Sequence, residues 1–166
     1  QIRKAGGFNV TLDPKQGITL SAGGTIRSYA GNTDAGTFEI PGPISGTGPL
    51  VLGNTADAAT IIVLSGHNTY TGGTTVNAGT TEVRADGGLG AGDVTVASRA
   101  SLRLTGGVSN TYIHSEATLT LNVTTNFVDL AFTGAPNVIK ALYINGVKMV
   151  SGTWGAVGSG ATHEHA

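Results

Sequence analysis

Hydrophobic and polar residues alternate in short runs along this chain, and the runs return at a longer, nearly fixed spacing. Between positions 66 and 104, apolar side chains occupy alternate positions around Val76 and Val83, and again around Val96 and Leu104. The interval from Val76 to Val96, like that from Val83 to Leu104, is about 20 residues. Alternation predicts strands with one buried face, and the return predicts that Val96 stacks on Val76 and Leu104 on Val83 in a β-solenoid.

Further repeats place strands upstream of this segment. Segments 31–40 and 53–64 both open on Gly-Asn-Thr, separated by nearly the same interval, and each continues into an extended apolar run. Short alternating runs at 8–12 and 18–20 are typical of strands with one buried face. The three prolines between positions 41 and 49 cannot donate to a strand ladder, so we expect them at corners or strand ends.

Downstream, the pattern predicts one more return and then a hairpin. Segments 111–113 and 119–121 follow the two preceding runs at a common, slightly shorter interval, which predicts a third coil stacked on them. Asn145-Gly146 is a strong hairpin signal, and it would set Tyr143 opposite Val147 or Lys148. We expect this hairpin to cap or flank the last coils; the alternative is a binding surface around Trp154.

Composition favours the same architecture. The 166 residues include 27 Gly, only 11% are charged, and 39% are hydrophobic, so the chain suits many short strands and not helices. The sequence therefore predicts an all-β, right-handed parallel β-helix (β-solenoid) forming one domain over residues 1–166. We expect the repeat core at about 18–121 and a C-terminal, hairpin-containing part at about 127–166.

The repeated segment also resembles a known family. GHNTYTGGTTVNAGTTEV at 66–83, followed by LGAGDVTV and ASLRL, is similar to the autotransporter-associated β-strand repeat, or passenger-associated transport repeat. ALYINGVKMVSGTWGAVGSGAT at 141–162 resembles the segment that often follows such repeats. The resemblance implies a bacterial, secreted or cell-surface β-helix, and it offers no catalytic residues because the repeat is a folding unit.

The net charge and the absence of cysteine limit the classes of partner and of metal site that the chain can have. A net charge of −1 provides no electrostatic basis for binding nucleic acid or an anionic membrane surface, and no apolar run is long enough to span a bilayer. Without cysteine there is neither a disulfide framework nor a cysteine-based metal site. Because the first residue is Gln1, we expect a processed product or an excised part of a larger protein, already without a signal peptide.

Candidate metal ligands are few, and we expect no cofactor. Asp13, Asp34 and Asp57 recur about once per coil and would form an acidic stripe suited to calcium, although Asp also favours corners by bonding its own backbone. His163 and His165 would point to one face of an extended segment and chelate a divalent metal; a frayed terminal tail is the alternative. GGLGAGD at 87–93 misses the calcium-binding spacing by a single position, which favours a flexible corner loop.

Two function classes follow. The first is a non-enzymatic structural β-solenoid, outside the cell or on its surface, that assembles head-to-tail into a fibre or surface structure. The second is a carbohydrate-active or carbohydrate-binding β-helix or an adhesin fragment, with a surface polysaccharide as partner. Glu82 near Arg84, with Arg103 one coil away, is the only catalytic possibility, and charge pairing between strands explains it as well.

Self-assembly would use the first alternating run. An open solenoid end presents unpaired backbone groups, and Phe8, Val10 and Leu12 form a strand able to pair with the exposed end of a neighbouring copy. The alternative is that this run is the first coil of its own subunit and that the chain is monomeric with capped ends.

Overall fold

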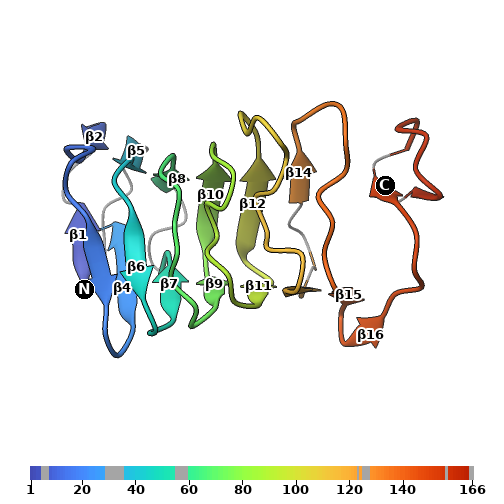
Figure 1. Ribbon diagram of the computed structural model, residues 1–166, viewed down its shortest axis with the longest axis horizontal. Helices are drawn as coiled ribbons and strands as arrows, with labels where there is room; N and C mark the ends of the chain where they lie inside the picture. Colours follow the sequence, from blue (N-terminus) through green and yellow to red (C-terminus); the bar gives the residue numbers. More distant parts are fainter. Residues whose placement is uncertain are drawn as a thin grey trace.

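The computed structural model describes residues 1–4, 8–28, 36–54, 60–122, 124, 128–155 and 157–164. These residues form strands, turns and bends, with no helix among them and hence no helix that could cross a membrane. The strands stack along one axis as a parallel β-solenoid, with the N-terminal coil at one end and the last strands at the other (Figure 1). The sequence prediction of an all-β solenoid is confirmed.

Two long sheets run along the rod. Sheet A joins, in this order, β1 (Ile2–Lys4), β4 (Gly24–Ser28), β7 (Leu50–Leu52), β9 (Thr74–Val76), β11 (Val94–Val96), β13 (Thr118–Leu121), β15 (Ala141–Ile144) and β16 (Val147–Lys148). Sheet B joins β2 (Val10–Thr11), β5 (Gly36–Ile40), β8 (Thr60–Leu64), β10 (Gly79–Val83), β12 (Ala100–Leu104) and β14 (Val128–Leu130). The pair β15–β16 is antiparallel, and the other neighbours in both sheets are parallel.

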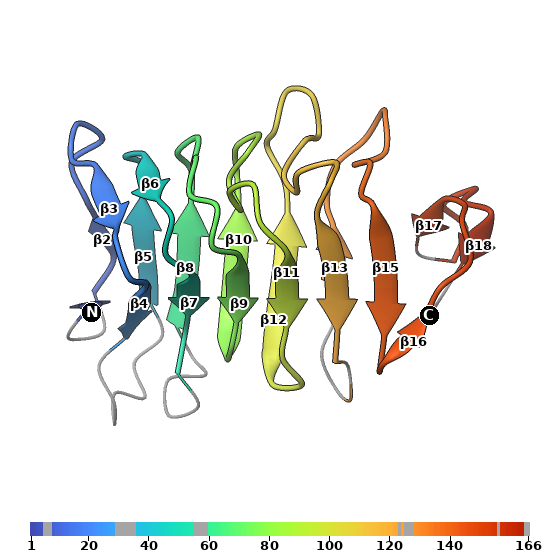
Figure 2. The same cartoon turned by 60° about the horizontal axis from the view of Figure 1, so that its bottom comes forward.

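Two short pairs complete the architecture. Strands β3 (Ile18–Leu20) and β6 (Ile44–Gly46) pair in parallel on the third side of the first coils. Strands β17 (Trp154–Gly155) and β18 (His163–Glu164) pair in parallel beyond β15 and β16, at the C-terminal end of the rod (Figure 2).

The predicted stacking of Val76, Val83, Val96 and Leu104 is confirmed. Val96 pairs with Val76 across β11 and β9, and Leu104 pairs with Val83 across β12 and β10. All four side chains are buried in one continuous core. Because each strand alternates its side chains, a shift by a single position would turn these valines out to solvent, so the apolar pattern itself selects the register.

Asparagines hold the coils together on the third side. Asn68 is buried; its Oδ1 accepts the N–H of Ile44 at 2.7 Å, and its Nδ2 donates to the carbonyl of Gly88 at 2.7 Å. Asn137 does the same for Ile113, accepting its N–H and donating to its carbonyl, both at 2.8 Å. These hydrogen bonds supply partners for backbone N–H and C=O groups that do not pair in a sheet, and buried backbone groups require such partners.

The C-terminal hairpin is also confirmed. Tyr143 pairs with Lys148 across β15 and β16. Asn145 and Gly146 have φ values of 49° and 80°, the two left-handed positions of a type I′ turn. The three prolines between 41 and 49 lie outside the strands, immediately before or after them, as predicted.

The predicted third return is wrong in its register. Leu121 pairs with Val96, and Leu104 pairs with Leu130, so 118–121 continues sheet A and not sheet B. Segment 111–113 is not a strand; Tyr112 and Ile113 are buried on the third side. The reason is the longer connection at 105–117, which delays the next sheet A strand by several positions.

The corner at 87–93 is packed and not the loose loop that its glycines suggested. Leu89 is fully buried, and its N–H donates to the carbonyl of Tyr112 at 3.2 Å. The N–H of Gly87 donates to the carbonyl of Thr111 at 2.8 Å, and that of Ala91 to Tyr70 at 2.9 Å. The segment is therefore an ordered layer between two neighbouring coils.

Candidate functional site: the two ends of the solenoid

The N-terminal end leaves apolar side chains incompletely covered. Ile2, Val10, Leu12 and Ile18 pack against the core but are only half-buried, because no coil lies in front of them among the described residues. A hollow of about 170 Å³ opens beside β1, lined in part by Ile2, Ile18, Leu20 and Ile26. Within the described chain, β1, β2 and β3 each pair along one edge only, so this end presents three strand edges.

Of the three residues proposed for assembly, two lie on the first coil of their own chain. Val10 pairs with Phe38 of β5, and the N–H of Leu12 donates to the carbonyl of Glu39 at 3.0 Å. The side chain of Phe8 is 78% exposed, contrary to the inward position that the alternation predicted for it. The chain bends at Phe8 before β2 begins, so the period of two does not extend back to this residue.

The C-terminal end is more apolar on its surface than the middle of the rod. Five of the exposed large hydrophobic side chains of the described residues lie between 130 and 157: Leu130, Val138, Val147, Val150 and Val157. Leu130 continues the core column of Leu104, yet it is 41% exposed because β14 pairs only with β12 within the described chain. A concentration of exposed apolar side chains in one part of a soluble protein makes that part a candidate interaction surface.

Charge is distributed unevenly along the axis. Residues 1–28 contain Arg3, Lys4, Lys15 and Arg27 against Asp13, a net charge of +3. The whole chain carries −1, so residues 29–166 carry −4. The C-terminal end is itself neutral, since Asp129 and Glu164 balance Lys140 and Lys148 there, so charge sets no direction for association between the two ends.

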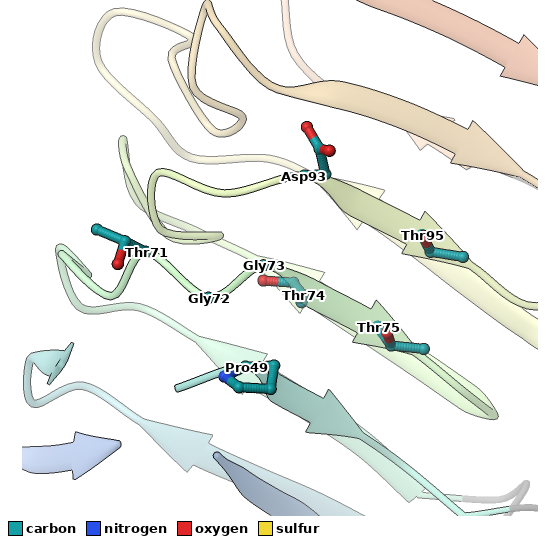
Figure 3. Close-up of a pocket in the computed structure, with 8 residues that line it drawn as sticks. All are labelled: Pro49, Thr71, Gly72, Gly73, Thr74, Thr75, Asp93 and Thr95. Carbon is teal, nitrogen blue, oxygen red and sulfur yellow. The ribbon is translucent and has the colours of Figure 1, made fainter. Parts of the chain in front are cut away.

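The other notable hollow lies on the outer face of sheet A. About 360 Å³ of space is lined by Pro49, Thr71, Gly72, Gly73, Thr74, Thr75, Asp93 and Thr95. Figure 3 shows Gly73 between Pro49, which directly precedes β7, and Asp93, which directly precedes β11. Thr75 and Thr95 lie side by side on the adjacent strands β9 and β11. Without a side chain at Gly73, the outer surface is recessed there. One carboxylate and several hydroxyls provide hydrogen bonds for a polar ligand.

The floor of that hollow is rigid. Thr74 points inward, and its Oγ1 shares a hydrogen bond with the Tyr70 hydroxyl and donates to the carbonyl of Leu89 at 3.0 Å. Burial raises the pKa of Tyr70 above its ordinary value, outweighing the opposite effect of the Thr74 hydrogen bond, so the phenol stays neutral. Asp93 Oδ1 accepts the N–H of Thr118 at 2.7 Å, which holds the carboxylate in place.

The charged residues considered for catalysis form ion pairs, one between residues two positions apart in the sequence and the others between strands. Arg84 Nε lies 2.7 Å from Glu82 Oε1, and Arg84 Nη1 lies 3.9 Å from Glu39 Oε1. Arg103 Nε lies 3.1 Å from Asp129 Oδ2 on the next strand. The hydrogen bond that Arg84 donates to the Glu82 carboxylate is the main cause that raises the pKa of Arg84. Each of these three carboxylates is therefore paired with an arginine, and the Arg103–Asp129 contact is a pair between adjacent strands.

Of the predicted metal ligands, only Asp13 and His163 lie among the described residues. Asp13 Oδ1 accepts the N–H of Lys15 at 2.8 Å, the local turn contact that was the alternative explanation. Asp34, Asp57 and His165 lie outside the described residues. His163 stacks on Trp154 with ring centroids 4.6 Å apart. In the described part of the chain, no group of three or more His, Cys, Asp or Glu side chains is placed to hold a metal.

Asp86 is a key polar residue that sequence reasoning missed. Its carboxylate accepts the N–H groups of Val108 at 3.0 Å, Ser109 at 2.8 Å and Thr111 at 2.9 Å, all in the next coil. Burial by itself raises the pKa of Asp86, but these backbone hydrogen bonds outweigh it and hold the pKa below its ordinary value. An Asp before a Gly-Gly corner is a weak signal, because its partners lie a full coil further along the chain.

Comparisons of the chain with protein-family models, curated proteins and solved structures found no match. The likeness to the autotransporter-associated repeat therefore rests on the sequence motifs alone.

Proposed function

We propose that this chain is a non-enzymatic structural β-solenoid of the bacterial cell surface or extracellular space that associates with further copies of itself through its ends. The observation that carries the proposal is that, among the described residues, both ends of the rod have incompletely covered apolar side chains and strand edges without a partner strand. Uncovered edges are templates for another strand, and contacts between unlike ends that do not close into a ring produce filaments.

The location outside the cell is supported by the repeat motifs at 66–104 and 141–162, which resemble those of secreted and surface β-helices. It is tested by labelling intact and permeabilised producing cells with an antibody against the chain. Surface labelling of intact cells is expected. Labelling that requires permeabilisation would contradict the proposed location and leave the assembly proposal to its own test.

Assembly is tested by light scattering over a range of protein concentrations and by electron microscopy. We expect mass to rise with concentration and rods of uniform width to appear. Replacing Val147 and Val150 with Glu should raise the concentration needed for association about tenfold or more, because charges would enter an apolar contact. Val108→Glu is the matched control, since Val108 is 96% exposed in the middle of the rod. A native chain that stays monomeric at every concentration refutes the proposal.

A second candidate function is supported by the threonine-lined hollow. Its hydroxyls, the Asp93 carboxylate and its position on an exposed sheet face suit the hydroxyl groups of a neutral saccharide. Thr75→Val and Thr95→Val should each reduce binding of a neutral oligosaccharide series by calorimetry. Val51 already occupies the same column of sheet A, so the fold accepts valine there. Thr120→Val, one strand beyond Thr95, is the control. Equal affinities in all three variants would exclude the hollow as the binding site.

A further inference from the structure

The last coil of the solenoid is incomplete on sheet B. Every earlier sheet A strand, from β1 to β13, is followed along the chain by a sheet B strand that covers the opposite side of the core. β15 breaks the rule, because the chain turns back at Asn145-Gly146 into β16 and does not return to β14. Within the described residues, the coil that begins with β15 has no sheet B strand, and the edge of β14 stays unpaired.

Core side chains at this level are uncovered as a result. Leu130 points into the core column of Leu104 but is 41% exposed, and Val128, in the column of Leu102, is only half-buried. Leu142 and Ile144 of β15 pack against the core yet are also half-buried. In Figure 1, β14 is the last strand of its row, and Figure 2 shows β17 and β18 further along the rod. One more strand placed beside β14 could therefore cover these apolar side chains and pair with the backbone edge of β14.

The N-terminal segment of the chain has the pattern that fits this position. In sheet B the inward columns run from Val10 through Phe38 to Val128, and from Ile40 through Leu104 to Leu130. Leu12 follows Thr11, the partner of Glu39, and so belongs beside Ile40. A copy of residues 8–12 placed in parallel beside β14 would continue both columns, with Val10 next to Val128 and Leu12 next to Leu130.

The pairing of this segment on its own chain is short. β2 contains only Val10 and Thr11. Two hydrogen bonds flank it: the N–H of Leu12 donates to the carbonyl of Glu39, and the N–H of Thr37 donates to Asn9 Oδ1 at 2.9 Å. Rigid stacking of two rods cannot place β2 beside β14, because β15 and β16 already occupy that level of sheet A. Residues 13–17 can extend about 17 Å, more than three strand spacings, so the connection from this segment to β3 is long enough to reach a neighbour.

We propose that residues 8–12 of one copy are donated to the edge of β14 in the next copy, in parallel register with Thr11 beside Asp129. This inference rests on the proposed self-association and specifies its contact.

The absence of cysteine makes a direct test available. Thr11→Cys protein is mixed with Asp129→Cys protein under assembly conditions and oxidised. The proposed register sets the two Cα atoms about 4.8 Å apart, within disulfide range. Arg103→Cys is the matched partner control: it removes the same Arg103–Asp129 ion pair, but β12 is covered by β14, which leaves about 9.6 Å between the Cα atoms. We expect a disulfide-linked dimer with Asp129→Cys at least about tenfold in excess over the control.

A synthetic peptide of residues 8–14 provides a second measurement on the unmodified chain. It should occupy β14 and shorten the assemblies, whereas a scrambled peptide should not. Assembly of the native chain without cross-linking and without a peptide effect would overturn the donated strand and leave end-to-end association standing. A native chain that does not assemble would overturn both. Equal cross-linking of Thr11→Cys to Asp129→Cys and Arg103→Cys would also refute the register.

Discussion

Truncation of a core valine tests whether the stacked columns hold the solenoid together. Val96 is fully buried between Val76 and Leu121 in the inward column of sheet A. Val96→Ala removes two methyl groups, worth about 1.6 kcal/mol of transfer free energy at about 0.8 kcal/mol for each. An unfilled cavity adds about 24 cal/mol for each Å³, so we expect a loss of about 2 to 3 kcal/mol in the free energy of unfolding.

The assay is urea unfolding followed by circular dichroism, at a concentration where the chain is monomeric. Hydrogen exchange of amides 74–76, 94–96 and 118–121 should show where protection is lost, because in a solenoid each coil contacts mainly its neighbours. Thr95→Ala is the control on the same strand, since Thr95 faces outward and should cost less than about 1 kcal/mol. The reasoning is refuted if the two variants lose the same free energy, or if protection falls equally along the whole rod.

Three further substitutions test other features of the fold. Asp86→Ala should cost about 1 kcal/mol at neutral pH, as loss of a helix cap does. Because the folded-state pKa of Asp86 is lowered, its contribution is present above the unfolded pKa of about 3.9 and disappears as the pH falls through the folded pKa. Urea titrations from pH 7 to pH 2 should show the two proteins converging, and a constant difference would contradict this. Thr81→Val should stabilise the chain by about 1 kcal/mol in the same assay, because the buried Thr81 hydroxyl has no hydrogen-bond partner among the described residues. Gly146→Ala should lower the thermal midpoint, at a cost of about 1 to 2 kcal/mol, because φ is 80° there and no atom within 4 Å obstructs a methyl group; an unchanged midpoint would mean that the turn rearranges.

Much of the fold could be predicted from local patterns in the sequence. Alternation at period two is a property of neighbouring residues, so the inward positions of Val76, Val83, Val96 and Leu104 could be assigned before any contact was known. The hairpin at Asn145-Gly146 depended on two residues that tolerate a positive φ, and it too is local. These features required no knowledge of how the coils meet.

Only the tertiary structure decided which strands pair and which polar side chains donate or accept hydrogen bonds to the backbone between them. The coil from Val96 to Leu121 is longer than the coil from Val76 to Val96, so Leu121 and not Ile113 stacks on Val96, and no local pattern encodes that difference. Asp86 and Asn68 satisfy backbone groups about one coil away, and their partners carry no side-chain signature because the contact is to backbone. The edge of β14 that no described strand covers is likewise invisible in the sequence, because it depends on the turn from β15 back into β16. The sequence by itself determined the strands and their faces, because side-chain alternation is local; the register, the caps and the open ends came from the lengths of the connections between them.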